Sequence, residues 1–183
     1  MGFVKAGRAV LLGLALVGGT AAYAATMSKE DYKAVRDRIA AEFKEQTASC
    51  DRLVGNARDV CREQAKGKEK VARAELEFNR SGDPKDAAKL AAAKADAVYE
   101  VALEKCDDRT GNDKDVCVKV AKANRAKAMA EVKANQKIAE AKRDASEEKR
   151  EADYNLAREK CDALAGDSKA QCLATAKARY GKS

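Results

Sequence analysis

The stretch CDRLVGNARDVC, from Cys50 to Cys61, decides the fold because it returns twice further along the chain. The second copy is CDDRTGNDKDVC, from Cys106 to Cys117, and the third is CDALAGDSKAQC, from Cys161 to Cys172. The two cysteines are eleven positions apart in every copy, and the three copies follow one another at an almost constant interval. Self-similarity at a fixed spacing indicates a repeat architecture.

Each copy predicts a helix, a tight turn and a second helix. A glycine stands five positions after the first cysteine, and glycine is the usual residue just past a helix end. The next residue is Asn or Asp, which are favourable helix N-caps. Two of the copies add an acid three residues later, which suits the start of a helix. We therefore expect Gly55, Gly111 and Gly166 to end one helix, and Asn56, Asn112 and Asp167 to cap the next.

The cysteines of each copy predict a disulfide across the hairpin. Cys50 lies five residues before Gly55 and Cys61 five residues after Asn56, so both reach the same height on antiparallel helices. A disulfide needs Cα atoms about 5.5–6 Å apart, which closely packed Ala-rich helices allow. Six cysteines permit about 15 connectivities. We predict the local one, which pairs Cys50 with Cys61, Cys106 with Cys117, and Cys161 with Cys172.

The N-terminus matches a cleavable secretory signal peptide at residues 1–24. Lys5 and Arg8 precede a ten-residue apolar run, and Ala22-Tyr23-Ala24 is an A-x-A cleavage site. A membrane-spanning helix takes about 20 residues, so an uncleaved anchor is the less favoured alternative. Export to an oxidising compartment agrees with the disulfide prediction. It leaves residues 25–183 as a single elongated helical repeat domain without a transmembrane segment.

The composition predicts long helices with a thin core. The chain has 183 residues, one Pro and no Trp, with 37% charged and 4% aromatic residues. Ala, Lys, Glu and Arg favour helices, but Ala buries little apolar area. We expect helices over 28–54, 57–79, 84–109, 113 onward, and 168–180. Ser81 to Pro84 should separate the second from the third. The fourth either runs unbroken to Gly166 or breaks near residues 135–137.

The expected fold class is all-α: elongated antiparallel helical hairpins in a coiled-coil-like bundle, with disulfide-stapled turns. Phe43, Tyr99 and Tyr154 lie seven residues before the first cysteine of each copy and should point into the packed stripe. The first four helices would form an up-down region, and the far part of the fourth would project and pack against the last. An extended rod and a dimer that completes the thin core are the competing arrangements.

Catalytic chemistry has little support in the sequence. No His is present, which excludes a His-based triad or metal site, and disulfide-bonded cysteines are not available as nucleophiles or ligands. The acidic second turn does not fit the calcium-binding loop pattern. We expect no catalytic, cofactor-binding or metal-binding residues. Free thiols with redox or zinc chemistry are the alternative.

The charge pattern points to envelope surfaces more than to nucleic acid. Cleavage after Ala24 would remove Lys5 and Arg8, and so lower the net charge from +7 to +5. This excess favours anionic envelope surfaces, but acids and bases alternate along the helices, as solvated faces do. No concentrated basic stripe with stacking aromatic residues is present, so we expect no nucleic-acid partner.

The repeated cysteine turns, together with KARYGK near the C-terminus, resemble a family of uncharacterised exported proteins. That family comes from proteobacteria of the Burkholderia and Ralstonia type and is often labelled similar to the envelope protein TolA. The resemblance implies a Gram-negative periplasm and supplies no catalytic residues. TolA-like proteins keep an inner-membrane anchor and a globular C-terminal domain, and this sequence shows neither pattern.

Together these features predict a non-enzymatic periplasmic structural or interaction protein of the cell envelope. Its partner would be an envelope protein or a second copy of the chain, with an anionic envelope surface as a further candidate. The alternative is a periplasmic binding or chaperone-like module for envelope polymers or unfolded clients.

Overall fold

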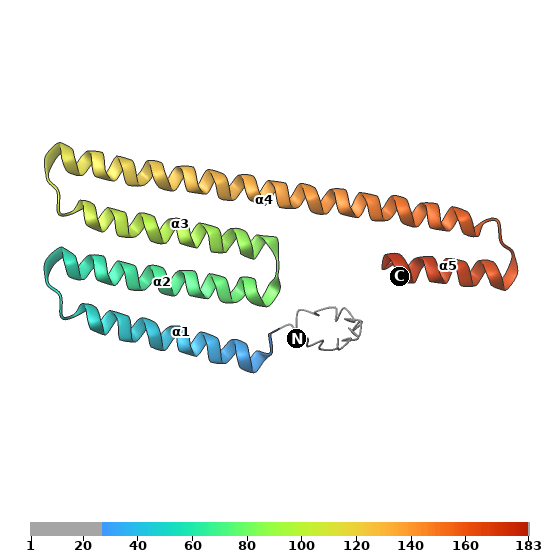
Figure 1. Cartoon of the computed structure of the whole chain (residues 1–183), viewed down its shortest axis with the longest axis horizontal. Coiled ribbons are helices and arrows are strands. Elements are labelled where there is room, and N and C mark those ends of the chain that lie inside the picture. Colours follow the sequence, from blue (N-terminus) through green and yellow to red (C-terminus); the bar gives the residue numbers. More distant parts are fainter. Residues whose placement is uncertain (1–26, 183) are drawn as a thin grey trace, which may run out of the picture.

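A computed structural model describes residues 27–182 and contains five α-helices over that range. They are α1 (Lys29–Cys50), α2 (Gly55–Ser81), α3 (Pro84–Cys106), α4 (Gly111–Cys161) and α5 (Gly166–Tyr180). The all-α prediction and the antiparallel hairpins are confirmed (Figure 1). The predicted signal peptide at residues 1–24 lies outside the described residues.

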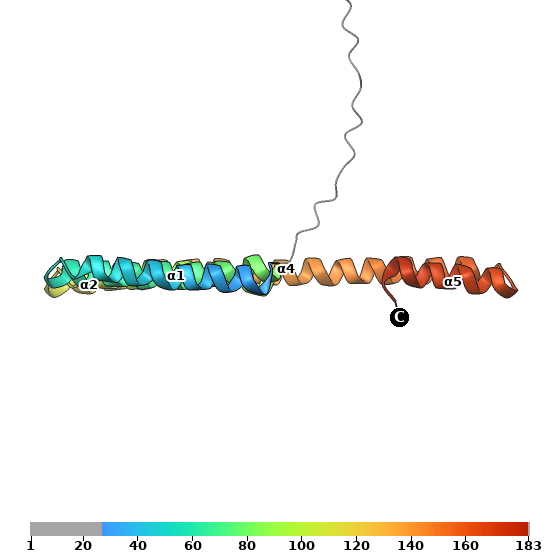
Figure 2. The ribbon, with the colours of Figure 1, turned by 90° about the horizontal axis from the view of Figure 1, so that it is seen from below.

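The helices form a single layer in which each helix contacts only its neighbours in the chain. Packing occurs between α1 and α2, α2 and α3, α3 and α4, and α4 and α5. The view along the layer shows that it is one helix thick (Figure 2). The helices therefore do not close around a central core, a feature that the sequence analysis did not predict. Both faces of the layer therefore remain open to solvent or to partners along every helix.

Helix α4 is continuous over 51 residues, which excludes the predicted alternative of a break near residues 135–137. Its N-terminal part packs on α3, and its C-terminal part extends beyond the other helices and packs on α5 (Figure 1). Between these two contacts, residues 141–150 are exposed on every side. Acidic and basic residues are interleaved there, and opposite charges three or four residues apart, such as Arg143 with Glu147 and Glu147 with Arg150, support an isolated helix.

The cysteine turns differ from the prediction in their caps. Gly55, Gly111 and Gly166 adopt positive φ angles of 58°, 54° and 57°, as expected, but they open the following helix instead of ending the preceding one. The preceding helices stop at Cys50, Cys106 and Cys161. The residue before each glycine is the N-cap, and no side chain caps α2, α4 or α5. The predicted capping role of Asn56, Asn112 and Asp167 is therefore wrong.

The turn between α2 and α3 follows the sequence prediction. Gly82 ends α2 with a φ of 62°, and its N–H donates to the carbonyl of Phe78. Asp83 caps α3 through its side chain, which accepts from the N–H of Lys85. Pro84 occupies the first helical position, where its missing N–H costs nothing. This turn brings α3 back along α2 and joins two hairpins into one layer.

The core consists of a narrow line of mostly small residues between helices. The three fully buried side chains are the first cysteines of the three pairs, and no charged or polar residue is buried in the described part of the chain. Gly67 of α2 faces Ala97 of α3, and a Cβ on Gly67 would lie 2.9 Å from the Ala97 Cβ. The close approach of α2 and α3 therefore depends on a glycine in mid-helix. The remaining buried residues are Ile39, Ala65, Leu76, Ala121, Tyr154 and Ala176.

Candidate interaction surfaces

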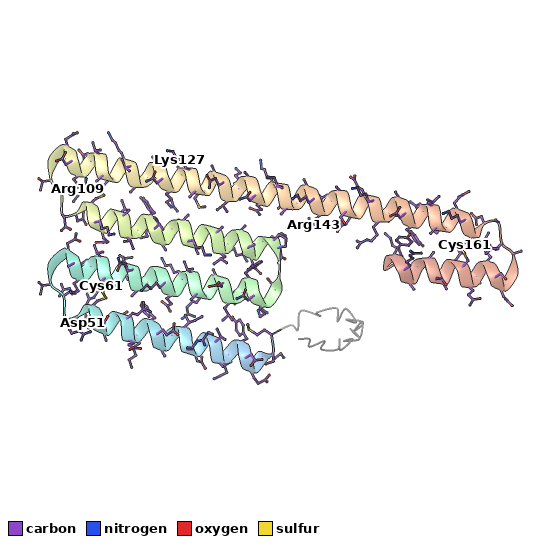
Figure 3. All side chains as sticks on the ribbon, viewed as in Figure 1. Asp51, Cys61, Arg109, Lys127, Arg143 and Cys161 are labelled. Atoms are coloured by element: carbon purple, nitrogen blue, oxygen red, sulfur yellow. A yellow bond between two sulfur atoms is a disulfide. The ribbon has the colours of Figure 1, made fainter. Side chains whose placement is uncertain are left out.

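Three disulfides fasten the hairpins in the predicted local pairing. Cys50 is bonded to Cys61, Cys106 to Cys117, and Cys161 to Cys172, with Cα–Cα distances of 5.6, 5.7 and 5.7 Å. No cysteine in residues 27–182 is free. Figure 3 shows Cys61 beside the first turn and Cys161 beside the third, at opposite ends of the molecule. These cysteines cross-link the two helices of each hairpin, and each sulfur atom is bonded to that of its partner.

The aspartate after each first cysteine makes an ion pair across its own turn. Asp51 pairs with Arg62, Asp107 with Lys114, and Asp162 with Lys169, each at 2.8 Å. This role was not predicted for the aspartates, although their recurrence in all three copies of the sequence was the available signal. Exposed pairs of this kind contribute roughly 0.2–1 kcal/mol each. They orient the turns more than they stabilise them.

Polar side chains also link neighbouring helices. The Asn56 amide at the start of α2 donates to the carbonyl of Glu104 at the end of α3, at 2.8 Å. At the other end of the layer, the Tyr32 hydroxyl of α1 donates to Glu77 of α2. Asn56 therefore ties the first hairpin to the second, which is a different function from the predicted helix cap.

The α3–α4 contact is centred on Arg125. Its guanidinium donates to Asp96 at 2.7 Å and lies 5.0 Å from the centre of the Tyr99 ring. The third hairpin uses a different pair, in which the Tyr154 and Tyr180 rings lie 6.2 Å apart. The predicted aromatic positions Tyr99 and Tyr154 thus point into helix contacts, as does Phe43, which is half-buried against α2.

One face of the layer carries two grooves that run on either side of α3. The first, between α2 and α3, has Val71, Ala97 and Val101 among its lining residues. The second, between α3 and α4, includes Ala91, Ala121 and Ala128. Lys94, Val98 and Ala102 line both grooves and form the ridge between them. Val98 is 71% exposed at the top of this ridge. We call this surface the α3 face.

The α3 face is apolar in its floor and basic at its rim. Three lysines border the α2–α3 groove, against a single acidic residue, Glu75. The lysines are Lys68, Lys94 and Lys105. This combination suits a partner with an apolar stripe flanked by acidic side chains.

No group of three or more His, Cys, Asp or Glu side chains converges within the described part of the chain as a metal site would require. Over residues 27–182, no helix combines the length and apolar character needed to cross a membrane.

Ionisable groups show small, local perturbations. Hydrogen bonds from Tyr32 and Arg80 lower the pKa of Glu77, and a hydrogen bond from Lys182 lowers that of Glu151. Glu104 behaves in the opposite way. Partial burial raises its pKa, and the nearby Asp107 carboxylate raises it further. No described cluster of perturbed groups resembles an acid–base pair for catalysis.

At pH 7, two matched variants should shift the melting temperature in opposite directions. The raised pKa of Glu104 means that its ionisation destabilises the fold, so Glu104→Gln should raise the melting temperature at pH 7 and leave it unchanged at pH 3, where Glu104 is protonated. The lowered pKa of Glu77 means that its ionised form stabilises the fold. Glu77→Gln should therefore lower the melting temperature at pH 7, and this loss should shrink as the pH falls through the folded pKa. Circular dichroism melts at both pH values test this. If each variant shifts the melting temperature by the same amount at pH 3 as at pH 7, the prediction is wrong.

Comparisons of the chain with protein-family models, with curated proteins and with solved structures each return no match.

Proposed function

We propose that the chain is a non-enzymatic periplasmic structural or interaction protein of the cell envelope, which holds a helical partner on its α3 face. The observation that carries this proposal is the single-layer fold, which leaves a pair of apolar grooves open beside an exposed ridge at Val98. A large apolar side chain in that position gains free energy when a partner covers it. The signal-peptide pattern and the three disulfides support the periplasmic location.

The proposed partner segment is an amphipathic helix with acidic flanks. The α2–α3 groove runs along two neighbouring helices, which gives it the length and shape to accept a third helix. Its lysine rim would attract acidic residues and speed the encounter, while Val98 and Val101 would supply the apolar contact.

Photo-cross-linking in cells tests this proposal. A photoreactive amino acid in place of Val98 should trap one defined envelope protein. The matched control is Lys122, which is two residues from the groove-lining Asn124 and therefore rotated by about 200° to the other face of the layer. Trapping from position 98 and not from position 122 supports the proposal. The same products from both positions, or none from position 98, would contradict it.

The alternative function is a chaperone-like or polymer-binding module, which the same lysine rim supports. It predicts many cross-linked products from position 98 instead of one. It also predicts that purified protein suppresses aggregation of unfolded clients, or binds anionic envelope polymers in a salt-sensitive manner.

A further inference from the structure

One edge of the layer is formed by α4 alone and is uncovered along its whole length. In the described structure α4 contacts only α3 and α5. Both lie along the same side of α4, so its other side faces outward from end to end (Figure 1). Lys127 projects on this outer side (Figure 3). We call this side the α4 edge.

The repeat relates α4 to the two helices that form the joint between the first and second hairpins. The first half of α4 follows the second cysteine turn, as α2 follows the first, so Asn112 corresponds to Asn56. The second half of α4 precedes the third turn, as α3 precedes the second, so Glu159 corresponds to Glu104. A single helix therefore carries both halves of a joint that, earlier in the chain, is made by α2 packing against α3.

The residues that make the α2–α3 joint are buried or half-buried, and their counterparts on α4 are exposed. Gly67 is buried against Ala97, Val60 lies two helical turns before Gly67 on the same stripe, and Val101 lines the groove. Their counterparts Val116 and Leu156 are 48% and 55% exposed. The buried or half-buried positions Asn56, Val60, Gly67, Ala97, Val101 and Glu104 correspond to the exposed positions Asn112, Val116, Ala123, Ala152, Leu156 and Glu159.

The two halves of the joint that α4 carries cannot meet within one chain. In the first joint the Asn56 amide donates to the Glu104 carbonyl. The counterparts, Asn112 and Glu159, lie near opposite ends of one unbroken helix, about 70 Å apart at a rise of about 1.5 Å per residue. Two antiparallel copies of α4 solve this problem, because Asn112 of each copy then reaches Glu159 of the other.

We propose that the α4 edge binds a second copy of the chain in an antiparallel, two-fold symmetric α4–α4 pair that reproduces the α2–α3 joint. Ala123 of one copy then faces Ala152 of the other, as Gly67 faces Ala97. The register places the two-fold axis near residues 136 and 137. A two-fold axis requires a self-complementary surface, and α4 has one because it carries both halves of the joint. The paired edges extend the single layer across two molecules.

The charges of α4 favour this antiparallel arrangement. Within the overlap, residues 112–137 contain seven basic and three acidic residues, whereas residues 138–159 contain seven acidic and five basic residues. Each basic half therefore lies against an acidic half of the second copy. On the edge itself, the register brings Lys127 of one copy opposite Glu148 of the other. It also brings the two copies of Lys137 together at the axis, where their like charges repel and weaken the pairing locally.

The paired length exceeds that of any contact within the chain. The α4–α4 overlap from Asn112 to Glu159 takes in nearly the whole of a 51-residue helix, compared with helices of 27 and 23 residues in the α2–α3 joint. It would cover the exposed apolar residues Val116 and Leu156 in both copies. Continuity with an existing joint of the same fold thus supports a second copy as the occupant of this edge.

Sedimentation equilibrium of the purified, oxidised protein tests the proposal. The unmodified protein should dimerise. Leu156→Asp should raise the dissociation constant by roughly a hundredfold or more, because two carboxylates would be buried without partners. Val98→Asp, the matched control on the α3 face, should leave the dissociation constant unchanged. Lys127→Glu and Glu148→Lys should each weaken the dimer, the double variant should restore it, and Lys137→Ala should tighten it.

Circular dichroism of each variant shows whether the helices remain, so a loss of folding is separated from a loss of pairing. A monomer across the whole concentration range would overturn the proposal. So would a dimer that Val98→Asp disrupts and Leu156→Asp does not. The α3 face and the α4 edge are separate surfaces, so failure of the dimer leaves the proposed partner at Val98 standing, and failure at Val98 leaves the dimer standing.

Discussion

Replacing Cys161 and Cys172 by serine should release α5 from the molecule. This helix has 15 residues and packs only on α4. Isolated helices of about 12–15 residues are marginal in water, so α5 depends on its attachment. The staple closes a loop of about a dozen residues, for which the chain-entropy estimate is on the order of 3 kcal/mol. The remaining links are the Asp162–Lys169 ion pair at the turn, and the Tyr154–Tyr180 contact and the Lys182–Glu151 ion pair near the end of the helix.

Hydrogen exchange measured by mass spectrometry checks this result. Amides of residues 166–180 should lose protection, whereas α1 to α3 should keep theirs. The matched control replaces Cys106 and Cys117 by serine, where α3 and α4 stay packed through Arg125, Asp96 and Tyr99. The control should lose stability without local release of a helix. Unchanged protection of residues 166–180 in the first variant would contradict the argument.

Gly67→Ala should destabilise the layer even though alanine favours helices more than glycine does. The new methyl group would lie 2.9 Å from the Cβ of Ala97, so α2 and α3 must separate. Overpacking of this kind costs about 1–3 kcal/mol. The gain in helix propensity offsets at most about 1 kcal/mol. We expect a net loss of stability, measured by denaturant unfolding followed by circular dichroism.

The reciprocal change at Ala97 gives a direct test of the contact. Ala97→Gly alone should cost about 1 kcal/mol in helix propensity. The double variant moves the methyl group from α3 to α2, so its stability should return close to that of the unmodified protein. If the two single effects simply add in the double variant, Gly67 and Ala97 do not touch.

Much of the local structure was predictable because its signals are short-range. The eleven-residue cysteine spacing predicted both the hairpins and the disulfides, and Ser81 to Pro84 predicted the remaining turn. The caps were predicted wrongly. A glycine with positive φ suits either the end of one helix or the start of the next, and Asn56 binds the carbonyl of Glu104 on another hairpin instead. A contact between hairpins has no signature within a single turn.

The single layer was harder to predict because alanine residues lie on several sides of each helix. An Ala-rich helix offers close packing in more than one direction, so the composition is equally compatible with a closed bundle and a flat layer. Gly67 was the available signal for the close α2–α3 approach, but a lone glycine in a helix does not identify its neighbour. The open grooves of the α3 face follow from the layer and were equally hidden in the sequence.

Small-angle X-ray scattering of the oxidised protein tests whether the chain forms a flat single layer along one unbroken α4. The scattering should give a thickness close to one helix diameter, about 10–12 Å, and a maximum dimension of at least about 75 Å, the length of 51 helical residues. Pairing at the α4 edge would leave the thickness unchanged. A compact particle with a radius of gyration of about 15 Å, the value expected for a globular chain of this size, would contradict both the layer and the continuous helix.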